Sequence, residues 1–431
     1  MHYLNLLKNF LRCYLYIFRY KLYLLKIKKV ASLISSNDNV ILAINHHYDQ
    51  DLDMLEAGFD DELKIVRINP MPTFNRALLY FKNNDERDGF IPYSKLDKVV
   101  LKNYNKICKS IFKDLHQITK FKILLMPSDS FWWIREFVSV CKENNIPTIV
   151  LDKEGTITPH DFEVHSQQIR ERFPFISDHL LVWTERQKEF WIKSGCPKEK
   201  IKIVGQPRSD FYFKPALWKS KSELEISDYK SIILFFTFDL DAYISAFPPE
   251  EIKRNNLSWK KLRDDINSII LELARNYVDN IFLIKTHPQQ SDIEYLKSFF
   301  KSANLPNIRL IEGAAISNQL IINSDIIIGF QTTALIESML TNKHIIYTQW
   351  GETEKKIRAD LIPFHESNAL IIADSQDNFK SILTSLLDNK IPNNNSFGDQ
   401  RTIFSNYWLN ADGKVAARVK EFLKETITYE H

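Results

Sequence analysis

Short runs of apolar residues alternate with longer amphipathic stretches along most of this 431-residue chain. The short runs have the length and the β-branched character of buried strands, whereas the stretches between them have the period of helices. Such alternation is typical of βαβ units, in which helices cover both faces of a parallel sheet. The expected strands are 40–44, 63–68, 122–126, 148–151, 179–183 and 201–204 in the first half, and 231–236, 280–284, 308–311, 325–328, 344–347 and 369–372 in the second.

The expected helices are 95–118, 131–145, 185–194, 250–278, 291–303, 316–323, 333–341, 376–388 and 410–427. Between the two groups of strands, residues 214–228 are polar and irregular, which predicts a linker, and 390–400 are expected to form a loop. The pattern therefore predicts two Rossmann-like αβα domains with a ligand cleft between them. Their expected ranges are 31–222 and 223–405, preceded by a helix in 1–30 and followed by a helix in 406–431.

Composition excludes few classes of ligand or binding partner. A net charge of +3 is too small to indicate binding to nucleic acid. The four cysteines are widely spaced and form no CxxC pair, so we predict neither a metal site nor a disulfide framework. The adjacent His46 and His47 lack the spacing of a helical metal pair. We therefore expect neither a metal nor a cofactor.

Residues 1–30 differ from the rest of the chain. They carry seven Lys or Arg residues and no acidic residue, interleaved with leucines and aromatic residues. Their apolar runs are shorter than the ~18–20 residues that span a bilayer, and no signal-peptide cleavage site follows. One interpretation is a helix that lies on an anionic membrane surface. The alternative is a first helix packed on its domain with solvated lysines; we favour the membrane interpretation.

The segment Lys285-Thr286-His287-Pro288 follows an apolar strand of the second half. Proline cannot continue the strand ladder, so the chain must turn outward here. His287 is then expected at the carboxyl end of the strand, where it can donate a hydrogen bond or a proton to a phosphate, with the charge of Lys285 nearby. The alternative is that His287 only caps the strand by bonding to a neighbouring carbonyl.

A second strand end carries Gln331-Thr332-Thr333, with Glu337 four residues into the helix that follows. Free N–H groups at a helix start, together with threonine hydroxyls, suit an anion, and the Glu337 carboxylate can accept hydrogen bonds from a ribose diol. The alternative has a threonine as N-cap and Glu337 as a solvated helix residue. Thr237, which follows the first strand of the second half, is expected at the same edge of the sheet.

The first half offers Asp152, Glu154 and Gly155 after the strand 148–151. A carboxylate at this strand end can deprotonate a hydroxyl, although a plain charged loop is the alternative. After the strand 201–204 come Arg208 and Asp210, which either contact a ligand or hold the domain boundary in place. We favour the second role for that pair.

Taken together, these motifs resemble GT-B glycosyltransferases, within the bacterial set that builds capsular and other surface polysaccharides. The chain resembles surface carbohydrate biosynthesis proteins and is similar to the sialyl- and Kdo-transferases that use CMP-sugars. The resemblance runs from about 147 to 350 and implies a GT-B type fold of two Rossmann-like domains with an inter-domain cleft. It also implies a general base at Glu154 and phosphate contacts at His287, Thr332 and Thr333. Lys153 stands where the CMP-sugar pattern has an acid, so the donor nucleotide stays open.

The function implied is a metal-independent glycosyltransferase that moves a sugar from a nucleotide-sugar donor to a growing cell-surface glycan or lipid-linked glycan. Such an enzyme is expected in the cytoplasm, at the inner face of the cytoplasmic membrane. The site would comprise the residues named above, namely Asp152, Glu154, Gly155, Arg208, Asp210, Thr237, Lys285, Thr286, His287, Pro288, Gln331, Thr332, Thr333 and Glu337. The alternatives are a CDP-glycerol-type polyol-phosphate transferase, a nucleotide-sugar 2-epimerase and a non-catalytic assembly protein.

Overall fold

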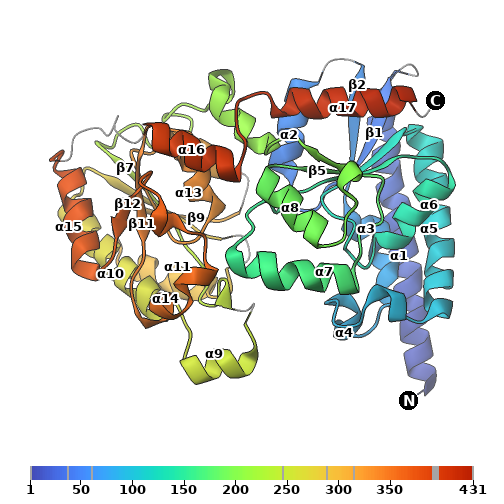
Figure 1. Ribbon diagram of the computed structural model, residues 1–431, viewed down its shortest axis with the longest axis horizontal. Helices are drawn as coiled ribbons and strands as arrows, with labels where there is room; N and C mark the ends of the chain where they lie inside the picture. The colour runs from blue at the N-terminus through green and yellow to red at the C-terminus, as the bar shows by residue number, and fades with distance from the viewer. Residues whose placement is uncertain are drawn as a thin grey trace. The chain divides into compact units, whose positions relative to one another are not determined.

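The computed structural model describes residues 2–35, 38–59, 62–244, 247–287, 290–313, 316–390 and 398–429, without the side chains of 2–10, 398 and 429. The chain forms two compact units, coloured along the sequence in Figure 1. Unit 1 comprises Met1–Ile157, Asp161–Asp210 and Asn410–His431, and unit 2 comprises Thr158–His160 and Phe211–Leu409. The boundary at Asp210 precedes the expected linker, because residues in 214–228 hydrogen-bond to unit 2. The Lys219 amide, for example, donates to Oε1 of Gln319 at 2.8 Å.

Unit 1 is built on a six-stranded sheet in the order β2-β1-β3-β4-β5-β6, and every neighbouring pair is parallel. The strands are β1 (Asn39–Ile44), β2 (Leu63–Ile68), β3 (Ile123–Met126), β4 (Thr148–Leu151), β5 (His179–Val182) and β6 (Ile201–Ile203). Its helices are α1 (His2–Ala31), α2 (Asp49–Gly58), α3 (Pro70–Phe74), α4 (Asn84–Arg87), α5 (Lys98–Thr119), α6 (Arg135–Glu143), α7 (Ser166–Arg172), α8 (Glu185–Lys193) and α17 (Val415–Tyr429).

Successive strand residues of unit 1 point to opposite faces, which gives the sheet a core on each side. Val40, Leu42 and Ile44 belong to the core that includes α5 and α6. Ile41 and Ala43 belong to the opposite core, to which α2 and α17 contribute. Both faces are thus covered by helices, as the near-continuous apolar strands require.

Unit 2 has its own six-stranded sheet, again parallel, in the order β12-β11-β10-β7-β8-β9. Its strands are β7 (Ile232–Phe236), β8 (Ile281–Lys285), β9 (Ile308–Ile311), β10 (Ile326–Gly329), β11 (His344–Thr348) and β12 (Ile371–Ala373). Its helices are α9 (Pro249–Asn255), α10 (Lys260–Asn276), α11 (Ile293–Ser302), α12 (Ser317–Asn323), α13 (Thr333–Ser338), α14 (Glu352–Ile357), α15 (Gln376–Leu387) and α16 (Gly398–Trp408). All twelve expected strands and the α/β class are confirmed.

One helix prediction and one loop prediction are wrong. The expected helix 250–278 is broken into α9 and α10, because Asn256 adopts a left-handed conformation with φ 49° that ends α9. The expected loop 390–400 ends in α16, while residues 391–397 lie outside the described part of the chain. Buried Arg401 fixes α16 by donating hydrogen bonds to the carbonyls of Ala369 and Thr341, at 3.1 and 3.0 Å.

The last helix, α17, belongs to unit 1. The Asp210 carboxylate accepts hydrogen bonds from the amides of Val415 and Ala416, at 3.0 and 2.9 Å, at the start of α17. A carboxylate in this position satisfies N–H groups that have no partner within the helix. Asp210 therefore ties the last strand region of unit 1 to α17.

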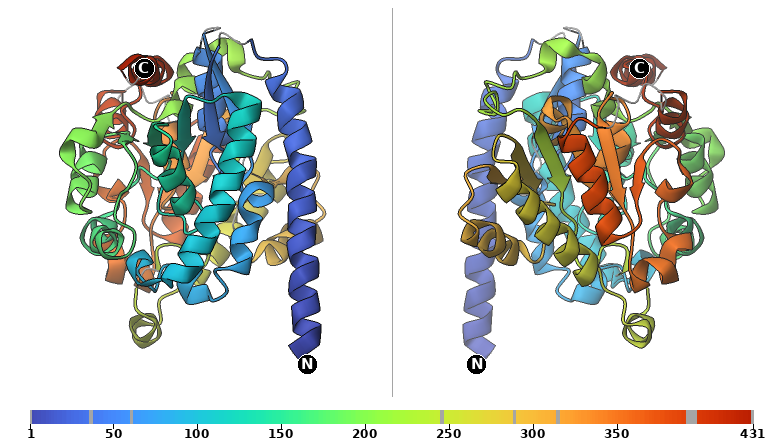
Figure 2. Two further views of the ribbon diagram at one scale, coloured as in Figure 1. Left: turned by 90° about the vertical axis from the view of Figure 1, so that its right-hand side faces the viewer. Right: turned by 90° about the vertical axis from the view of Figure 1, so that its left-hand side faces the viewer.

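The first helix, α1, runs along one edge of unit 1, and its N-terminal part projects beyond the neighbouring helix α5 (Figure 2). Tyr20 and Ile27 are buried against the unit, each with 3% of its surface exposed. Among the helices of the described residues, none has the length and apolar character needed to cross a bilayer.

Candidate functional site

The strand order of unit 2 places a topological switch point at its centre. From β7 the chain proceeds outward through β8 and β9, then returns to the other side of β7 and continues through β10, β11 and β12. In open parallel sheets, ligands bind outside the carboxyl ends of the strands at such a reversal. Because Phe236 pairs with Lys285 and Phe235 with Ile328, the segments after β7, β8 and β10 start at one edge. The sequence-predicted residues Thr237, Lys285, Thr286, Gln331 and Thr332 are brought together there.

Lys285 is buried at this edge, with 2% of its surface exposed. Its amine donates a hydrogen bond to the Thr286 carbonyl at 2.6 Å, and no ion pair among the described residues includes it. Burial lowers the pKa of Lys285 to about 8. Thr286 is tied to the neighbouring strand, because its amide and hydroxyl both donate to the Ile311 carbonyl, at 3.0 and 3.3 Å. The edge therefore holds a cation that is poorly compensated within the protein.

His287 follows as an exposed residue, and its carbonyl accepts a hydrogen bond from the Gln290 amide at 3.1 Å. His287 also interacts with at least one further group. Pro288, predicted to contact the donor, lies outside the described residues together with Gln289.

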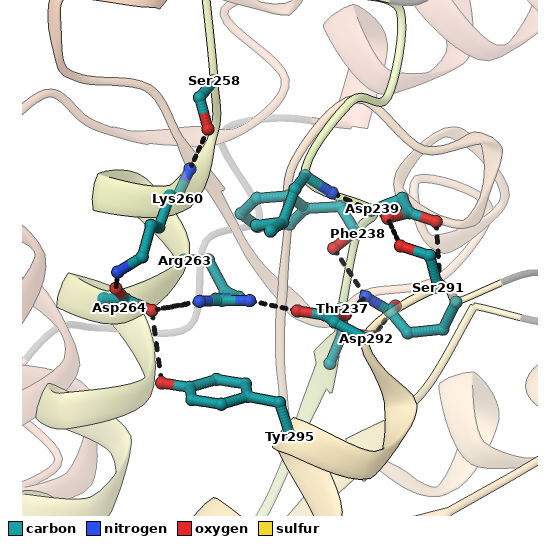
Figure 3. A network of polar contacts seen from close by, with 12 residues as sticks. Thr237, Phe238, Asp239, Ser258, Lys260, Arg263, Asp264, Ser291, Asp292 and Tyr295 are labelled. Atoms are coloured by element: carbon teal, nitrogen blue, oxygen red, sulfur yellow. Dashed lines mark hydrogen bonds and ion pairs between the residues drawn. The ribbon is translucent and has the colours of Figure 1, made fainter.

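A polar network joins the loops after β7 and β8 (Figure 3). The Thr237 hydroxyl donates to Oε1 of Gln290 at 2.8 Å, and Nε2 of Gln290 donates to the Phe238 carbonyl at 3.0 Å and to Asp292 at 2.5 Å. The Ser291 amide donates to the Asp239 carboxylate at 3.0 Å. The Thr237 hydroxyl thus helps to hold the loop after β8 in place through Gln290, without any ligand.

Arg263, on α10, anchors this network and is 4% exposed. Its guanidinium donates hydrogen bonds to Asp292 and, at 2.7 Å, to Asp264. It also lies 4.2 Å from the centre of the Tyr295 ring, whose hydroxyl donates to Asp264 at 3.3 Å (Figure 3). The cation therefore holds the start of α11 against α10, through paired charges and a cation–π contact.

Gln331 follows β10 in a left-handed conformation, with φ 43°, and its side chain is buried. Its amide group donates to the Tyr347 hydroxyl at 2.7 Å and to the Ile362 carbonyl at 3.0 Å, and it accepts from the Ile362 amide at 2.9 Å. These bonds satisfy most of what a glutamine amide can form. Gln331 therefore shapes the turn at the edge through contacts inside the unit.

Thr332 is the N-cap of α13, since its hydroxyl accepts from the Ala334 amide at 3.3 Å. The helix that begins at Thr333 is only six residues long. Glu337 is buried rather than solvated, and its carboxylate accepts a hydrogen bond from the Tyr212 hydroxyl at 3.1 Å. The capping interpretation of Thr332 is thus confirmed, and the solvated interpretation of Glu337 is wrong because its side chain is buried and bonded to Tyr212.

In unit 1, Asp152 follows β4 and is almost fully buried. Its carboxylate accepts hydrogen bonds from Trp191 Nε1 at 2.6 Å, Gln187 Nε2 at 2.9 Å and the Glu154 amide at 3.2 Å. Burial nevertheless raises the pKa of Asp152 to about 7. A carboxyl group that titrates near neutrality can exchange a proton under ordinary conditions.

Glu154 and Gly155 differ sharply in exposure. The Glu154 side chain is 79% exposed, and its carboxylate lies 3.0 Å from the Lys153 amine. Gly155 is buried, and a Cβ atom there would lie 1.9 Å from the Trp183 ring. Glycine is required because the backbone turn passes directly over the indole.

Arg208 also lies against Trp183, with its guanidinium 5.3 Å from the ring centre. Its amide donates to Asp51 on α2 at 3.0 Å, and its guanidinium pairs with the same carboxylate at 3.3 Å. Arg208 therefore holds the segment after β6 against α2, while Asp210 caps α17. Arg208 and Asp210 therefore both hold parts of unit 1 together.

The sequence matches no protein-family model and no curated protein. Solved structures do match. The UDP-GlcNAc 2-epimerase from Neisseria meningitidis bound to UDP-GlcNAc is 14% identical with a TM-score of 0.53, covering 90% of this chain and 100% of that one. A putative UDP-N-acetylglucosamine 2-epimerase from Listeria monocytogenes is 12% identical with a TM-score of 0.54, covering 90% and 96%. The UDP-GlcNAc 2-epimerase from Methanocaldococcus jannaschii is 15% identical with a TM-score of 0.51, covering 90% and 99%. The fold is GT-B-like.

Within this GT-B-like fold, Arg263 and Gln290 were not predicted as site residues, and His46 was considered only as a metal ligand. His46 lies at the switch point of unit 1, after β1, and its ring is 4.8 Å from Phe131 and 5.6 Å from Trp133. Burial, with smaller contributions from His47 and Lys153, lowers the pKa of His46 to about 4. The position of His46 after a strand was the signal available. No local signal marked Arg263 or Gln290, since the contacts that join them to the network include the distant residues Asp292 and Thr237, respectively.

Proposed function

We propose that the protein acts on a nucleotide-activated sugar and transfers the sugar to a cell-surface glycan or lipid-linked glycan. The observation that carries this proposal is the buried cation Lys285 at the switch point of unit 2, a position where open parallel sheets bind ligands. A phosphate group beside Lys285 would supply the missing counter-charge. The GT-B-like fold supports the same interpretation.

In this proposal the donor phosphate is stabilised by Lys285, with His287 as the exposed group that hydrogen-bonds to it or protonates it. Thr237 and Gln331 act by holding the loops in place, because their side chains bond inside the unit. Thr286, Pro288, Thr332, Thr333 and Glu337 remain proposed donor-side residues.

Transfer also needs a base for the attacking hydroxyl, and we retain Glu154 in that role. Asp152 is the competing candidate, because its pKa of about 7 suits a general base better than that of an ordinary carboxyl group. Experiment can distinguish these two candidate bases. Glu154 is exposed to solvent, whereas Asp152 accepts hydrogen bonds from Trp191 and Gln187. Loss of these two hydrogen bonds should therefore change the rate of transfer if Asp152 is the base.

A second candidate function is epimerisation of a nucleotide sugar. It is favoured by the three similar structures, which are named as UDP-GlcNAc 2-epimerases. Epimerisation consumes only the nucleotide sugar, so it needs no acceptor. The identities of 12–15% support the shared fold and leave the reaction to experiment.

The deciding experiment incubates the protein with UDP-, CMP-, CDP- and GDP-linked substrates, first alone and then with an acceptor glycan, and follows the products by NMR. Sugar transfer that depends on acceptor supports the proposal. Conversion of the sugar without acceptor supports the epimerase, and transfer of a polyol phosphate supports the polyol-phosphate transferase. No turnover of any donor, together with no nucleotide binding in thermal-shift assays, would leave a non-catalytic assembly protein.

Residue roles are tested in the same assay. Glu154→Gln should abolish transfer while nucleotide binding is kept, with Glu171→Gln as an exposed control in unit 1. If Glu154→Gln turns over normally and Asp152→Asn does not, the base is Asp152. His287→Ala should weaken nucleotide binding; unchanged affinity would return His287 to a capping role.

A further inference from the structure

The helix α1 presents two opposite faces from Leu11 onward, and one of them is fixed to unit 1. Tyr20 and Ile27 are each 3% exposed, and Tyr23 and Leu24 pack against the same core. The Tyr23 hydroxyl accepts a hydrogen bond from the Asn69 amide at 2.6 Å, and the Arg76 guanidinium lies 5.2 Å from the Tyr20 ring. This attachment determines which side of α1 faces away from the unit.

The opposite face carries a continuous row of exposed apolar side chains, here called the apolar stripe. Its members are Leu11, Tyr14, Leu15, Phe18, Leu22 and Leu25, with exposures of 58, 68, 43, 53, 47 and 64%. Because they recur every three or four residues, they lie on one side of the helix. A run of this length on one face marks an interaction surface, whereas singly exposed apolar residues need no explanation.

Basic residues border the apolar stripe on both sides, and all are exposed. Arg12, Arg19 and Lys26 are spaced by seven and form one row, while Lys21 and Lys28 form a row on the other side. The helix contains no acidic residue between His2 and Ala31. The exposed half of α1 therefore combines an apolar centre with two cationic borders.

Two kinds of partner fit an apolar stripe, and charge separates them. A second copy of α1 could pair through this spacing, but its basic rows would then face basic rows with no acid in the helix to balance them. An anionic lipid surface supplies the opposite charge, and long basic side chains keep their ends in the headgroup layer while their stems cover apolar surface. The distribution of charge on the helix thus favours lipid.

We propose that the apolar stripe lies in the headgroup region of an anionic membrane, with α1 parallel to the surface and its buried face holding unit 1 there. This arrangement is that of an interfacial helix, in which apolar side chains enter the lipid and basic ones border them. The proposal goes beyond the expected basic helix because it assigns the residues that enter the lipid and those that do not. It does not depend on the reaction proposed above.

The test is flotation of the full chain with vesicles of phosphatidylcholine alone and with vesicles of phosphatidylcholine and phosphatidylglycerol in equal parts. The stripe variant carries Leu15→Glu and Leu22→Glu, and the control carries Val278→Glu and Ile403→Glu, which replace apolar residues of unit 2 that are each 63% exposed. The wild type and the control should float with the anionic vesicles, and the stripe variant should not. Unchanged melting temperatures show that the variants fold.

A second variant tests the basic rows without touching the stripe. Replacing Arg12, Arg19 and Lys26 with Gln should lower the partition coefficient onto anionic vesicles by roughly 100-fold, at about 5-fold for each basic residue near the surface. The proposal is overturned if the wild type does not float, if it floats equally with both vesicles, or if the stripe variant still floats. A dimer in light scattering that the stripe variant converts to a monomer, without vesicle binding, would assign the stripe to a second copy.

Discussion

Replacement of Lys285 by Met is expected to make the ligand-free protein more stable. At neutral pH the wild type buries an ammonium group whose one described hydrogen bond is to the Thr286 carbonyl. Methionine has a similar length and an apolar end, so it keeps the methylene packing and removes the buried charge. A residue that costs stability in the free protein is expected where a ligand later supplies the missing partner.

The size of the effect follows from the pKa of Lys285. Burial lowers it from its usual 10.5 to about 8, which corresponds to a cost of about 3 kcal/mol for holding the charged form. The variant loses the hydrogen bond to the Thr286 carbonyl, which is worth about 1 kcal/mol. The net gain in the free energy of unfolding should therefore be about 2 kcal/mol at neutral pH.

The pH dependence has a definite sign. Below the folded pKa of about 8 the lysine is charged in both states, so the full cost is present and the variant is favoured. As the pH rises from about 8 to 10.5, the folded wild type loses its proton before the unfolded chain does, and its stability rises relative to the variant. The advantage of Lys285→Met should accordingly disappear across this window.

Urea denaturation of both proteins at several pH values measures the difference, with Lys301→Met on the exposed face of α11 as the control. The control should change the free energy of unfolding by less than about 0.5 kcal/mol. Thermal-shift assays with nucleotides should show that Lys285→Met no longer gains stability from the ligand that protects the wild type. If the variant is less stable at neutral pH, or if its advantage does not vary with pH, the assignment of Lys285 as an uncompensated cation is wrong.

Three further predictions concern stability and are read from urea midpoints. Gly155→Ala should lower the free energy of unfolding by about 1–3 kcal/mol, because its Cβ would overlap the Trp183 ring; an unchanged midpoint would contradict the close approach. Arg263→Leu should cost about 3–5 kcal/mol, since it leaves the carboxylate of Asp292 without its buried cation; a cost below that of an exposed ion pair would contradict the role of the network. The pKa of Asp152 is raised from 3.8 to about 7, so the folded wild type keeps its proton where the unfolded chain loses it. As the pH rises through that range, the free energy of unfolding of the wild type should fall by up to about 4 kcal/mol relative to that of Asp152→Asn. Equal pH dependence of the free energy of unfolding in the two proteins would refute this.

Strands β3, β7 and β10 were predictable because each is buried on both faces and reads as an uninterrupted apolar run. Ile326–Gly329 and Ile232–Phe236, for example, contain no polar side chain. The break between α9 and α10 was not predictable from periodicity, since it depends on a left-handed Asn256. Helix α16 was missed for a similar reason: Arg401 anchors it through carbonyls of Thr341 and Ala369, which are far away in sequence.

In the candidate site, too, local features were predictable from the sequence and long-range contacts were not. A strand end is a local feature, so Thr237, Lys285 and Gln331 could be assigned to one edge from the expectation of a parallel sheet alone. What each side chain does there depends on distant partners, such as Ile362 for Gln331 and Tyr212 for Glu337. The burial that moves the pKa of Lys285 is likewise produced by the assembled fold, so it has no signature in the sequence.

The position of α17 has a consequence for how the chain folds during synthesis. The core on one face of the unit 1 sheet includes Val415, Val419 and Leu423, which the ribosome produces only after all of unit 2. Unit 2 is nearly continuous in sequence and can complete its core first, whereas one face of the unit 1 sheet is covered only in part, by α2, until α17 is made. The nascent first half is therefore the stage most exposed to aggregation and to chaperones. Loss of the α17 segment should unfold unit 1 while leaving unit 2 intact.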